Sequence, residues 1–334
     1  MQDRITLSHG GGGSMTRELV ESVFLPAFGS ETLALLEDSA VLRLPPGRVA
    51  FTTDAFVVRP LFFRGGDIGR LAVCGTVNDL AVSGAEPRFL SVAFVIEEGL
   101  ETEILRRVAR SIAQAAREAG VQVATGDTKV VEKGAADQLF VTSSGIGEVP
   151  EGRRLGAAEI RPGDRVIVSG TLGDHGIAVL SEREGLRFST PVSSDVAPLN
   201  GLAAAALAAG GVHAMRDPTR GGFAAAVNEL AAQAGVGAEL REEDLPVRPE
   251  VQAACDMLGL DPLTVANEGK LVLFAAPDTA DRVLAALRAH PLGGHARIAG
   301  EATAAHPGIV VVGTRIGGRK ILEMPFGEGL PRIC

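Results

Sequence analysis

The sequence predicts a mixed α+β protein built from two domains. A chain of 334 residues has the length of about two domains of ordinary size. Apolar runs of strand type alternate with helical patterns in both halves of the chain. A stretch rich in structure breakers, from Pro150 to Gly163, separates the two halves. These observations predict a first domain over residues 37–150 and a second over residues 151–326.

The chain begins with a glycine-rich arm and a helix, assigned to residues 1–36. Glycines 10–13 precede a helical pattern that includes Leu19 and Phe24. Within the first domain a helix is expected to carry Asn78 and Asp79. The remaining elements predicted there are strands over residues 49–53 (ending at Asp54), 89–96, 121–125 and 139–146, and a helix over residues 104–119 that Gly120 terminates.

The second half is predicted to be mixed as well and to end in a flexible tail. Apolar runs predict strands over residues 165–169 and 271–275, and helical spacing predicts helices over residues 224–234 and 279–289. Residues 327–334 contain two glycines and a proline and lack periodicity. They are therefore expected to form a pliable tail that ends in a thiol.

Composition argues against several function classes. The chain is 46% hydrophobic and 22% charged, as globular proteins are, and no stretch reaches the roughly 20 apolar residues of a membrane helix. The net charge of −9 repels phosphate backbones, so nucleic-acid binding is disfavoured. The N-terminus shows no apolar leader segment, which favours a cytoplasmic location. The three cysteines form no CxxC pair, so thiol chemistry would involve a single sulfur.

Aspartates at the ends of apolar runs or beside glycine are the first candidates for a functional site. Carboxylates brought together repel one another unless a hard cation neutralises them, and Mg²⁺ with a polyphosphate is a common solution. Any one of these aspartates alone would more often be a helix cap or a turn residue. Five in similar settings favour a metal-nucleotide site: Asp38, Asp54, Asp79, Asp127 and Asp217.

No standard nucleotide motif accompanies these aspartates. The only Gly-Lys pair, at residues 269–270, lacks the P-loop spacing, and neither a dinucleotide fingerprint nor a nucleophile elbow is present. Phosphates could instead be bound by residues 127–129 and 219–222, which supply positive side chains, hydroxyls and glycine amides at an expected helix start. Lys129 and Arg220 could equally be solvated surface charges.

Two further segments offer reactive groups. Residues 267–270 place a carboxylate and an amide on a short turn before a strand, which suits proton transfer, although a surface turn with an ion is the competing interpretation. Cys334 either ends the chain by chance or acts as a tethered carrier that moves a bound group between active sites. Cys74 and Cys255 lie inside apolar segments and are predicted to be core residues.

Seven stretches carry a family resemblance: residues 9–13, 53–58, 75–84, 126–129, 216–222, 266–270 and 331–334. Together they resemble the HypE family of hydrogenase maturation factors, the carbamoyl dehydratases, nearly end to end. The aspartate segments alone are similar to a wider superfamily that includes aminoimidazole ribonucleotide synthetase, selenophosphate synthetase and thiamine monophosphate kinase. The terminal Pro-Arg-Ile-Cys narrows the resemblance to one family.

The resemblance implies a PurM-like fold and an ATP-dependent reaction. In such a fold the N-terminal domain forms a β-barrel-like core across a homodimer, with ATP beside it, and a C-terminal α+β domain packs alongside. A carbamoyltransferase, HypF, would load a carbamoyl group onto Cys334. The chain would then dehydrate this group to a thiocyanate, and HypC and HypD would accept the cyanide. Phosphorylation makes chemical sense here because an amide oxygen is otherwise a poor leaving group.

The resemblance also implies roles for individual residues. Cys334 would carry the reacting group, Lys129 would act near the phosphates, and Glu268 would accept a proton. Mg²⁺ would be bound by Asp38, Asp54, Asp79 and Asp217. ATP would be contacted by Asp38, Asp54, Asn78, Asp79, Asp127, Thr219, Arg220, Gly221 and Gly222.

Three alternative functions make different demands on the sequence. A selenophosphate synthetase should present a reactive cysteine near its N-terminus, and no cysteine precedes Cys74. A kinase or synthetase acting on a small free substrate would use the same aspartates but would not need Cys334. A catalytically silent scaffold would present its tail to partners and would not need the acidic cluster.

Overall fold

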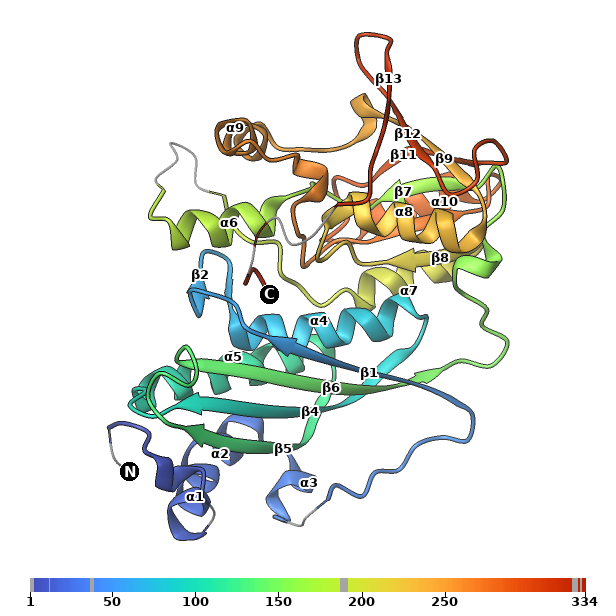
Figure 1. Ribbon diagram of the computed structural model, residues 1–334. Coiled ribbons are helices and arrows are strands. Elements are labelled where there is room, and N and C mark those ends of the chain that lie inside the picture. Colours follow the sequence, from blue (N-terminus) through green and yellow to red (C-terminus); the bar gives the residue numbers. More distant parts are fainter. Residues whose placement is uncertain (1–2, 12, 37–38, 187–191, 326–329, 331) are drawn as a thin grey trace.

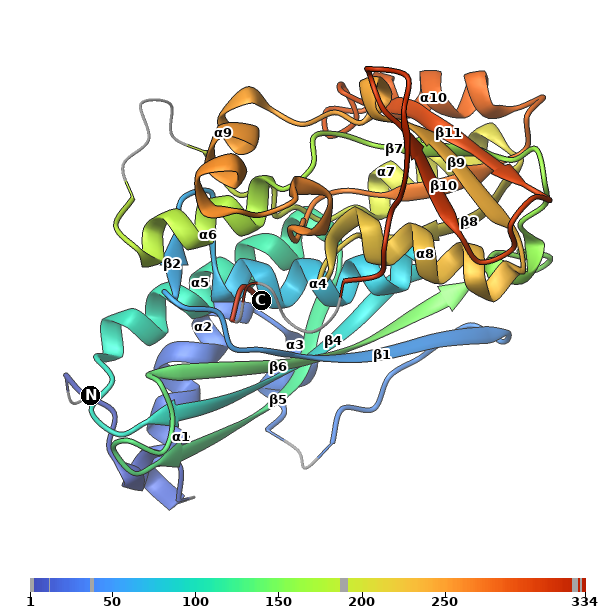
Figure 2. The same ribbon diagram turned by 45° about the horizontal axis from the view of Figure 1, so that its top comes forward.

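The protein consists of two layered halves, one above the other in the view of Figure 1. This computed structural model describes residues 3–11, 13–36, 39–186, 192–325, 330 and 332–334. Asp38 lies outside the described residues. The carboxyl end of the chain reaches the space between the two halves, beside α4, in both Figure 1 and Figure 2. The two-domain α+β fold predicted from the sequence is confirmed.

The N-terminal half is built on a four-stranded sheet in the order β1-β6-β4-β5. Neighbouring strands are antiparallel except β4 and β5, which run parallel because helix α5 crosses over between them. A small antiparallel pair, β2 and β3, precedes α4. The elements are α1 (Gly13–Leu19), α2 (Leu25–Phe28), α3 (Glu31–Ala34), β1 (Arg48–Phe56), β2 (Phe62–Phe63), β3 (Gly66–Asp67), α4 (Ile68–Val82), β4 (Glu86–Glu97), α5 (Thr102–Ala119), β5 (Gln122–Val131) and β6 (Leu139–Val149).

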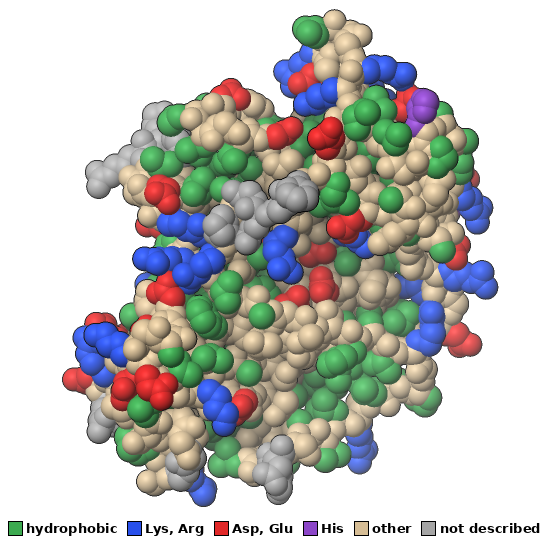
Figure 3. Space-filling model, in the orientation of Figure 1, with side chains coloured by type: hydrophobic (Ala, Val, Ile, Leu, Met, Phe, Trp, Pro, Cys, Tyr) green, Lys and Arg blue, Asp and Glu red, His purple; other side chains and the backbone are tan. Residues whose placement is uncertain are grey.

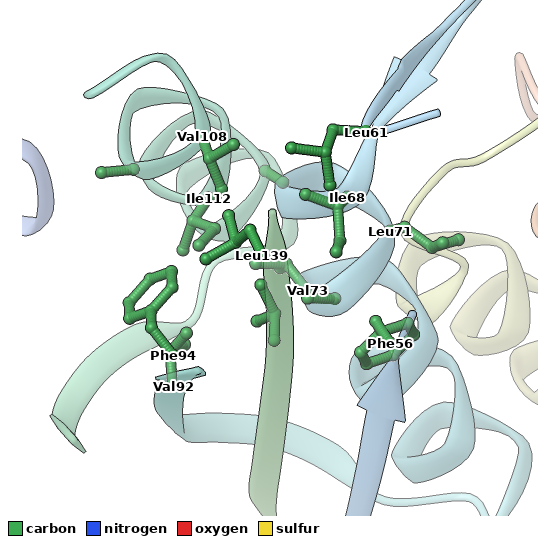
Figure 4. Close-up of a cluster of buried hydrophobic side chains, with 14 of the residues drawn as sticks. Phe56, Leu61, Ile68, Leu71, Val73, Val92, Phe94, Val108, Ile112 and Leu139 are labelled. Carbon is green, nitrogen blue, oxygen red and sulfur yellow. The ribbon is translucent and has the colours of Figure 1, made fainter. Parts of the chain in front are cut away.

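Helices α4 and α5 cover one face of this sheet. Alternate strand residues point towards these helices and form a continuous apolar core with them, part of which Figure 4 shows around Leu139 and Val73. Phe94 of β4 also stacks on Phe24 at the N-terminal end of the chain, with ring centroids 4.9 Å apart. The opposite sheet face carries apolar side chains that are open to solvent, including Phe51, which is 70% exposed.

The C-terminal half contains a seven-stranded sheet in the order β13-β12-β9-β11-β7-β10-β8. Its pairs are antiparallel except β9 and β12. Helix α8 covers one face, against Val166 and Val168 of β7, while Ile167 between them faces the cluster of α7 and α10. The elements are β7 (Arg165–Val168), α6 (Asp174–Arg183), α7 (Asn200–Ala209), β8 (Val212–Arg216), α8 (Gly222–Ala234), β9 (Gly237–Arg241), α9 (Pro249–Leu258), β10 (Val272–Ala275), α10 (Ala280–Ala289), β11 (Arg297–Thr303), β12 (Val310–Gly313) and β13 (Arg319–Ile321).

Most predicted elements are confirmed, and the four strands of the first sheet are longer than predicted. Strand β5 continues through Gly126 to Val131 instead of stopping at Thr125. Glycine weakens a strand in the sequence pattern, but here its lack of a side chain has a structural use. A Cβ at Gly126 would lie 2.3 Å from the carbonyl oxygen of Val92, so only glycine permits the approach of β4. Asp127 and Lys129 therefore lie within a strand rather than after one.

Two other features of the chain bear on function. Cys74 and Cys255 are fully buried in the core, as predicted. None of the helices in the described part of the chain combines the length and apolar character needed to cross a bilayer.

Candidate active site between the two domains

Two aspartates of the first domain face each other where β1 packs on α4. The even-numbered residues of β1 point towards α4, so Thr52 and Asp54 lie on the helix side of the sheet. The Thr76 hydroxyl donates to Asp54 Oδ2 at 2.8 Å, and the Thr52 hydroxyl donates to Asp79 Oδ2 at 2.8 Å. The carboxylate on β1 therefore accepts a hydroxyl hydrogen bond from α4, and the carboxylate on α4 accepts one from β1.

The second domain adds Asp217 to this pair, from the loop between β8 and α8. Burial, together with the charges of Asp79 and Asp54, raises the pKa of Asp217 to about 7. The pKa values of Asp54 and Asp79 are raised mainly by burial as well. The positive charge of Arg220 acts in the opposite direction and lowers both pKa values, but by less than burial raises them. Arg220 therefore lies near the acidic cluster. We use the term acidic cluster for Asp54, Asp79, Asp217 and Glu268.

The loop that carries Arg220 opens helix α8 with two glycines. Gly221 and Gly222 both adopt positive φ, of 77° and 62°, which favours glycine. A Cβ at Gly222 would lie 2.6 Å from the carbonyl oxygens of Leu263 and Val265. The predicted segment Thr219–Gly222 therefore does occupy a helix start, whose backbone N–H groups can bind an anion.

Glu268 lies on a turn fixed by its neighbours. Gly173 N–H donates to Asn267 Oδ1 at 2.8 Å, and the Asp195 carboxylate accepts from the N–H groups of Glu268 and Gly269, both at 3.1 Å. The Asp195 carboxylate also pairs with Lys270 Nζ at 2.9 Å. The main chain of this turn is thus fixed by hydrogen bonds to neighbouring segments, independently of the Glu268 side chain.

The Glu268 side chain itself is buried without compensation from the protein. It is 2% exposed, and its Oε1 has no hydrogen-bond partner among the described residues. Burial raises the pKa of Glu268 well above its usual range, and the charges of Asp217 and Asp195 raise it further. A buried carboxyl that prefers to hold a proton is suited to proton exchange with a bound molecule.

Asn78 connects the two domains. Its Nδ2 donates to the carbonyl oxygens of Ala197 at 3.1 Å and Glu268 at 3.3 Å, and its Oδ1 accepts from Leu199 N–H at 2.7 Å. The amide is therefore engaged by protein groups in this structure. Asn78 orients the backbone of the Glu268 turn in this structure, and its predicted contact with phosphate stays a prediction.

The end of the tail is docked between the domains. Val57 N–H donates to the main-chain oxygen of Cys334 at 3.2 Å, and Arg332 Nε donates to the carbonyl oxygen of Val57 at 3.0 Å. Arg332 Nη1 also donates to Asp137 Oδ2 at 2.7 Å, and this contact lowers the pKa of Asp137. These bonds dock the last residues in this structure, and the pliability predicted for the tail stays a prediction. Residues 326–329 and 331 lie outside the description.

A buried histidine also contacts the tail. Ile333 is 3% exposed, and its carbonyl oxygen lies 3.0 Å from Nε2 of His175, the second residue of α6. The next residue of α6, Gly176, donates its N–H to the carbonyl oxygen of Ala266, two residues before Glu268. One helical turn thus contacts both the tail and the Glu268 turn.

Asp127 and Lys129 are not brought to this site within one chain. Strand β5 forms the edge of the sheet opposite β1, with β6 and β4 between them. Asp127 and Lys129 pair with Ala93 and Val95 of β4, and both are exposed. Three strand spacings of about 4.8 Å separate their strand from that of Asp54.

The acidic cluster has the chemistry of a hard-cation site, although its groups do not form a preassembled cage. No set of three or more His, Cys, Asp or Glu side chains in the described ranges is arranged to hold a metal ion. Carboxylate oxygens are nevertheless the ligands that Mg²⁺ prefers, and the nearby arginines do not offset the burial that raises the pKa values of these carboxylates. The residues therefore fit a magnesium-bound phosphate. Figure 3 shows acidic and basic side chains together at the surface between the two halves.

Comparisons with known proteins agree with this geometry. The AIR synthase related protein family matches with its N-terminal domain over residues 36–149 and its C-terminal domain over residues 161–313. Carbamoyl dehydratase HypE of Rhizobium leguminosarum bv. viciae is 53% identical over 333 residues, which cover 99% of this chain and 95% of the relative. The chain belongs to the HypE family of carbamoyl dehydratases.

Solved structures of the HypE family extend the comparison. The structure of hydrogenase maturation protein HypE in complex with ATP is 46% identical, with a TM-score of 0.95 over 98% of this chain and 99% of that one. The HypE chain of a HypE–HypF complex is 47% identical, with a TM-score of 0.81 over 92% of this chain and 99% of that one. The family predicted from the seven sequence stretches is confirmed.

Sequence reasoning missed several residues that shape this site. His175, Asp195 and Asp137 contact the tail or the Glu268 turn, but none lies in a stretch that resembles a known motif. The only local signal was the pair of glycines that flanks Asp174–His175, at the start of a helix that the sequence did not predict. Their partners in the tail and in the Glu268 turn are between 73 and 195 positions away in sequence, so proximity arises only in the fold.

Proposed function

We propose that this chain uses ATP to dehydrate a carbamoyl group on its own Cys334 to a thiocyanate, which supplies cyanide ligands for nickel-iron hydrogenase. The docked tail is the observation that carries the proposal. The Val57 N–H and the His175 imidazole bond to the main-chain oxygens of Cys334 and Ile333 and hold them between the domains, where helix α6 also contacts the Glu268 turn. A terminal cysteine without a role would not be expected to make such specific contacts.

The proposed reaction breaks one C–O bond and two N–H bonds. The S-carbamoyl group has the form S–C(=O)–NH₂, and the thiocyanate product has the form S–C≡N. ATP supplies a phosphoryl group to the carbamoyl oxygen, which then leaves as phosphate. The nitrogen must lose two protons, and Glu268 is the proposed acceptor because its carboxyl is buried and its Oε1 has no hydrogen bond within the described part of the chain.

The acidic cluster is proposed to hold Mg²⁺ with the ATP phosphates. Asp54, Asp79 and Asp217 would supply carboxylate oxygens, and the prediction for Asp38 stays open to the same test. Thr219, Arg220 and the amides of the α8 start would face phosphate oxygens. These residues would orient the triphosphate, while neighbouring protein groups exclude water from Glu268.

A homodimer is proposed to complete the site. Asp127 and Lys129 cannot reach the acidic cluster within their own chain, but a second copy could place its β5 strand there. The open sheet face supports this arrangement, because Phe51 and Val49 on it are 70% and 52% exposed. Burial of such a face is favourable in a dimer.

Three partner proteins and a compartment follow from the proposed reaction. HypF would load the carbamoyl group, which is consistent with the solved HypE–HypF complex of a relative. HypC and HypD would accept the cyanide. The reaction requires ATP and a reduced thiol, both of which the cytoplasm provides.

Intact-protein mass spectrometry tests the proposal directly. The full chain and Cys334→Ala are each incubated with HypF, carbamoyl phosphate and Mg-ATP. A mass gain matching thiocyanate, present only when Cys334 is present, is the expected result. ATP consumption without an adduct would contradict the proposal and would indicate an enzyme that acts on a free substrate. Absence of both turnover and adduct would indicate a scaffold.

A further inference from the structure

The imidazole of His175 lies at the centre of a small network around the tail. The ring is fully buried and packs edge-on against Phe63, with ring centroids 5.4 Å apart at 88°. Nε2 lies 3.0 Å from the Ile333 carbonyl oxygen, and Nδ1 lies 2.8 Å from Ser194 Oγ. Both ring nitrogens are therefore engaged, one by the tail and one by the second domain.

The identity of these partners fixes the tautomer. A carbonyl oxygen can only accept, so Nε2 carries the hydrogen and donates it to Ile333. Burial lowers the pKa of His175 below its usual value, so the ring is neutral and Nδ1 accepts from the Ser194 hydroxyl. The ring thus has a defined orientation, with its donor aimed at the peptide that precedes the reactive thiol.

The same segment that orients His175 also holds the Glu268 turn. Ser194 contacts the imidazole, and the adjacent Asp195 accepts from the N–H groups of Glu268 and Gly269 and from Lys270 Nζ. Two consecutive residues thereby connect the tail to the turn that carries the proposed proton acceptor. A shift of the tail peptide relative to this turn would break the hydrogen bond from His175.

We propose that His175 is a positioning residue, whose Nε2–H donates to the Ile333 carbonyl and so holds Cys334 in place relative to Glu268 during dehydration. The role is that of a latch on the main chain, so it does not depend on the group that the sulfur carries. This inference rests on the proposed function, because it assigns His175 to the dehydration step and not to carbamoyl loading by HypF.

Four variants of the full chain distinguish the effect of the hydrogen-bond donor from the effect of ring packing. His175→Phe keeps an aromatic ring against Phe63 but removes the donor. His175→Gln places an amide N–H near the position of Nε2. Ser194→Ala removes the hydroxyl that orients the ring. His295→Phe makes the same chemical change at an exposed position and serves as the matched control.

Two readouts test whether the hydrogen bond from His175 to Ile333 holds the tail. The first is the rate of Cys334 alkylation by iodoacetamide, measured by intact mass, since Cys74 and Cys255 are fully buried and should react little. The second is the single-turnover rate of thiocyanate formation after Mg-ATP is added to chain that HypF has already carbamoylated. Thermal unfolding of every variant is recorded beside both.

We expect His175→Phe to speed alkylation and to slow dehydration by about 10-fold, the loss that an unmade bond to a buried carbonyl should cause. Ser194→Ala should also speed alkylation and slow dehydration, but by less than His175→Phe does. His175→Gln should restore both rates to within about 2-fold of wild type, and His295→Phe should leave them unchanged. Carbamoyl loading should be the same in all variants.

Two results would overturn the inference. Alkylation and dehydration of folded His175→Phe at wild-type rates would mean that the hydrogen bond does not hold the tail. Equal losses in His175→Phe and His175→Gln would mean that the ring is needed only for packing. If wild-type chain itself fails to form thiocyanate, the proposed function fails, while the alkylation rates still decide whether His175 holds the tail.

Discussion

Two groups of charged side chains lie between the domains, and their electrostatic states are opposite. In the acidic cluster the pKa values of Asp79, Asp217 and Glu268 are all raised, because burial and like charges are not balanced by protein cations. At the tail the pKa of Asp137 is lowered, because Arg332 donates to its carboxylate. The protein thus completes one set of interactions with its own residues and leaves the other to a ligand.

The difference indicates which region the protein prepares for binding and which it holds for positioning. Unbalanced carboxylates reduce stability until a cation binds them, so the acidic cluster gains from magnesium and phosphate. The hydrogen bonds of the tail are formed between protein groups alone, so they can hold the tail main chain in place without a ligand. Variants in the two regions should therefore affect different quantities.

The largest effect is expected for Glu268→Gln. The amide keeps the shape of the side chain but cannot accept a proton, so dehydration should slow by about 100-fold or more. The unfolding temperature should not fall, because a neutral amide replaces a buried carboxyl whose Oε1 has no partner in the described residues. Single-turnover mass spectrometry and thermal unfolding measure the two effects. A dehydration rate equal to that of the exposed control Glu182→Gln would remove Glu268 from the mechanism.

Asp79→Asn should act on magnesium use. One carboxylate of the acidic cluster loses its charge, so the Mg²⁺ concentration needed for half-maximal ATP turnover should rise by about 10-fold. A magnesium titration of ATP hydrolysis measures it, with exposed Asp278→Asn as the matched control. An unchanged midpoint would contradict the proposed metal role, and it would leave Asp79 as a structural partner of Thr52 only.

Asp137→Asn should act on the tail without affecting magnesium use. The charge-assisted bond to Arg332 is partly exposed, with side-chain exposures of 33% and 30%, so its loss should raise Cys334 alkylation by only about 2- to 5-fold. Arg59→Gln is the matched control, since Arg59 Nη1 pairs with the same Asp137 carboxylate at 3.2 Å. Equal alkylation of Asp137→Asn and wild type would show that the main-chain bonds hold the tail alone.

The smallest effect is expected in the pH dependence of stability without a ligand. Folding raises the pKa of Asp217 from 3.8 to about 7, so the folded state binds the proton more tightly than the unfolded state. Ionisation of Asp217 therefore opposes folding as pH rises from about 4 to about 7. In EDTA, wild type should lose more stability than Asp217→Asn between about pH 5 and about pH 8.

Urea unfolding of wild type and Asp217→Asn at both pH values measures this difference. Saturating Mg-ATP should reduce it, because a bound cation stabilises the ionised carboxylate. A pH dependence that is identical in the two proteins would mean that Asp217 ionises normally in the folded state. In that case the acidic cluster would not be under electrostatic strain, and the contrast with the tail would disappear.

Local patterns predicted much of the fold for a physical reason. Helix α5 was placed to within two residues because its apolar stripe is amphipathic and Gly120 adopts the left-handed conformation that ends a helix. Strands β4, β6 and β10 were found because they are buried on alternate or all positions. Helices α6, α7 and α9 were missed, since they are short or rich in alanine and their packing comes from distant segments.

The candidate site was predictable only in part. Asp54, Asp79, Asp217 and Glu268 were selected from local settings, and the structure brings them within electrostatic reach of one another. Asp127 and Lys129 were selected by the same reasoning but lie on the far edge strand. The order of strands in a sheet cannot be read from the local sequence. Sequence spacing alone therefore could not distinguish the residues of the acidic cluster from the two residues on β5.

The sequence by itself determined the family, the two-domain α+β architecture and the residue types available for chemistry, because these depend on local motifs and on the periodicity of apolar residues. Only the tertiary structure decided that the last residues dock between the domains and that His175 donates to the tail. The reason is that these contacts join residues up to 277 positions apart, as Val57 and Cys334 are, and that they end on main-chain oxygens, which every amino acid shares.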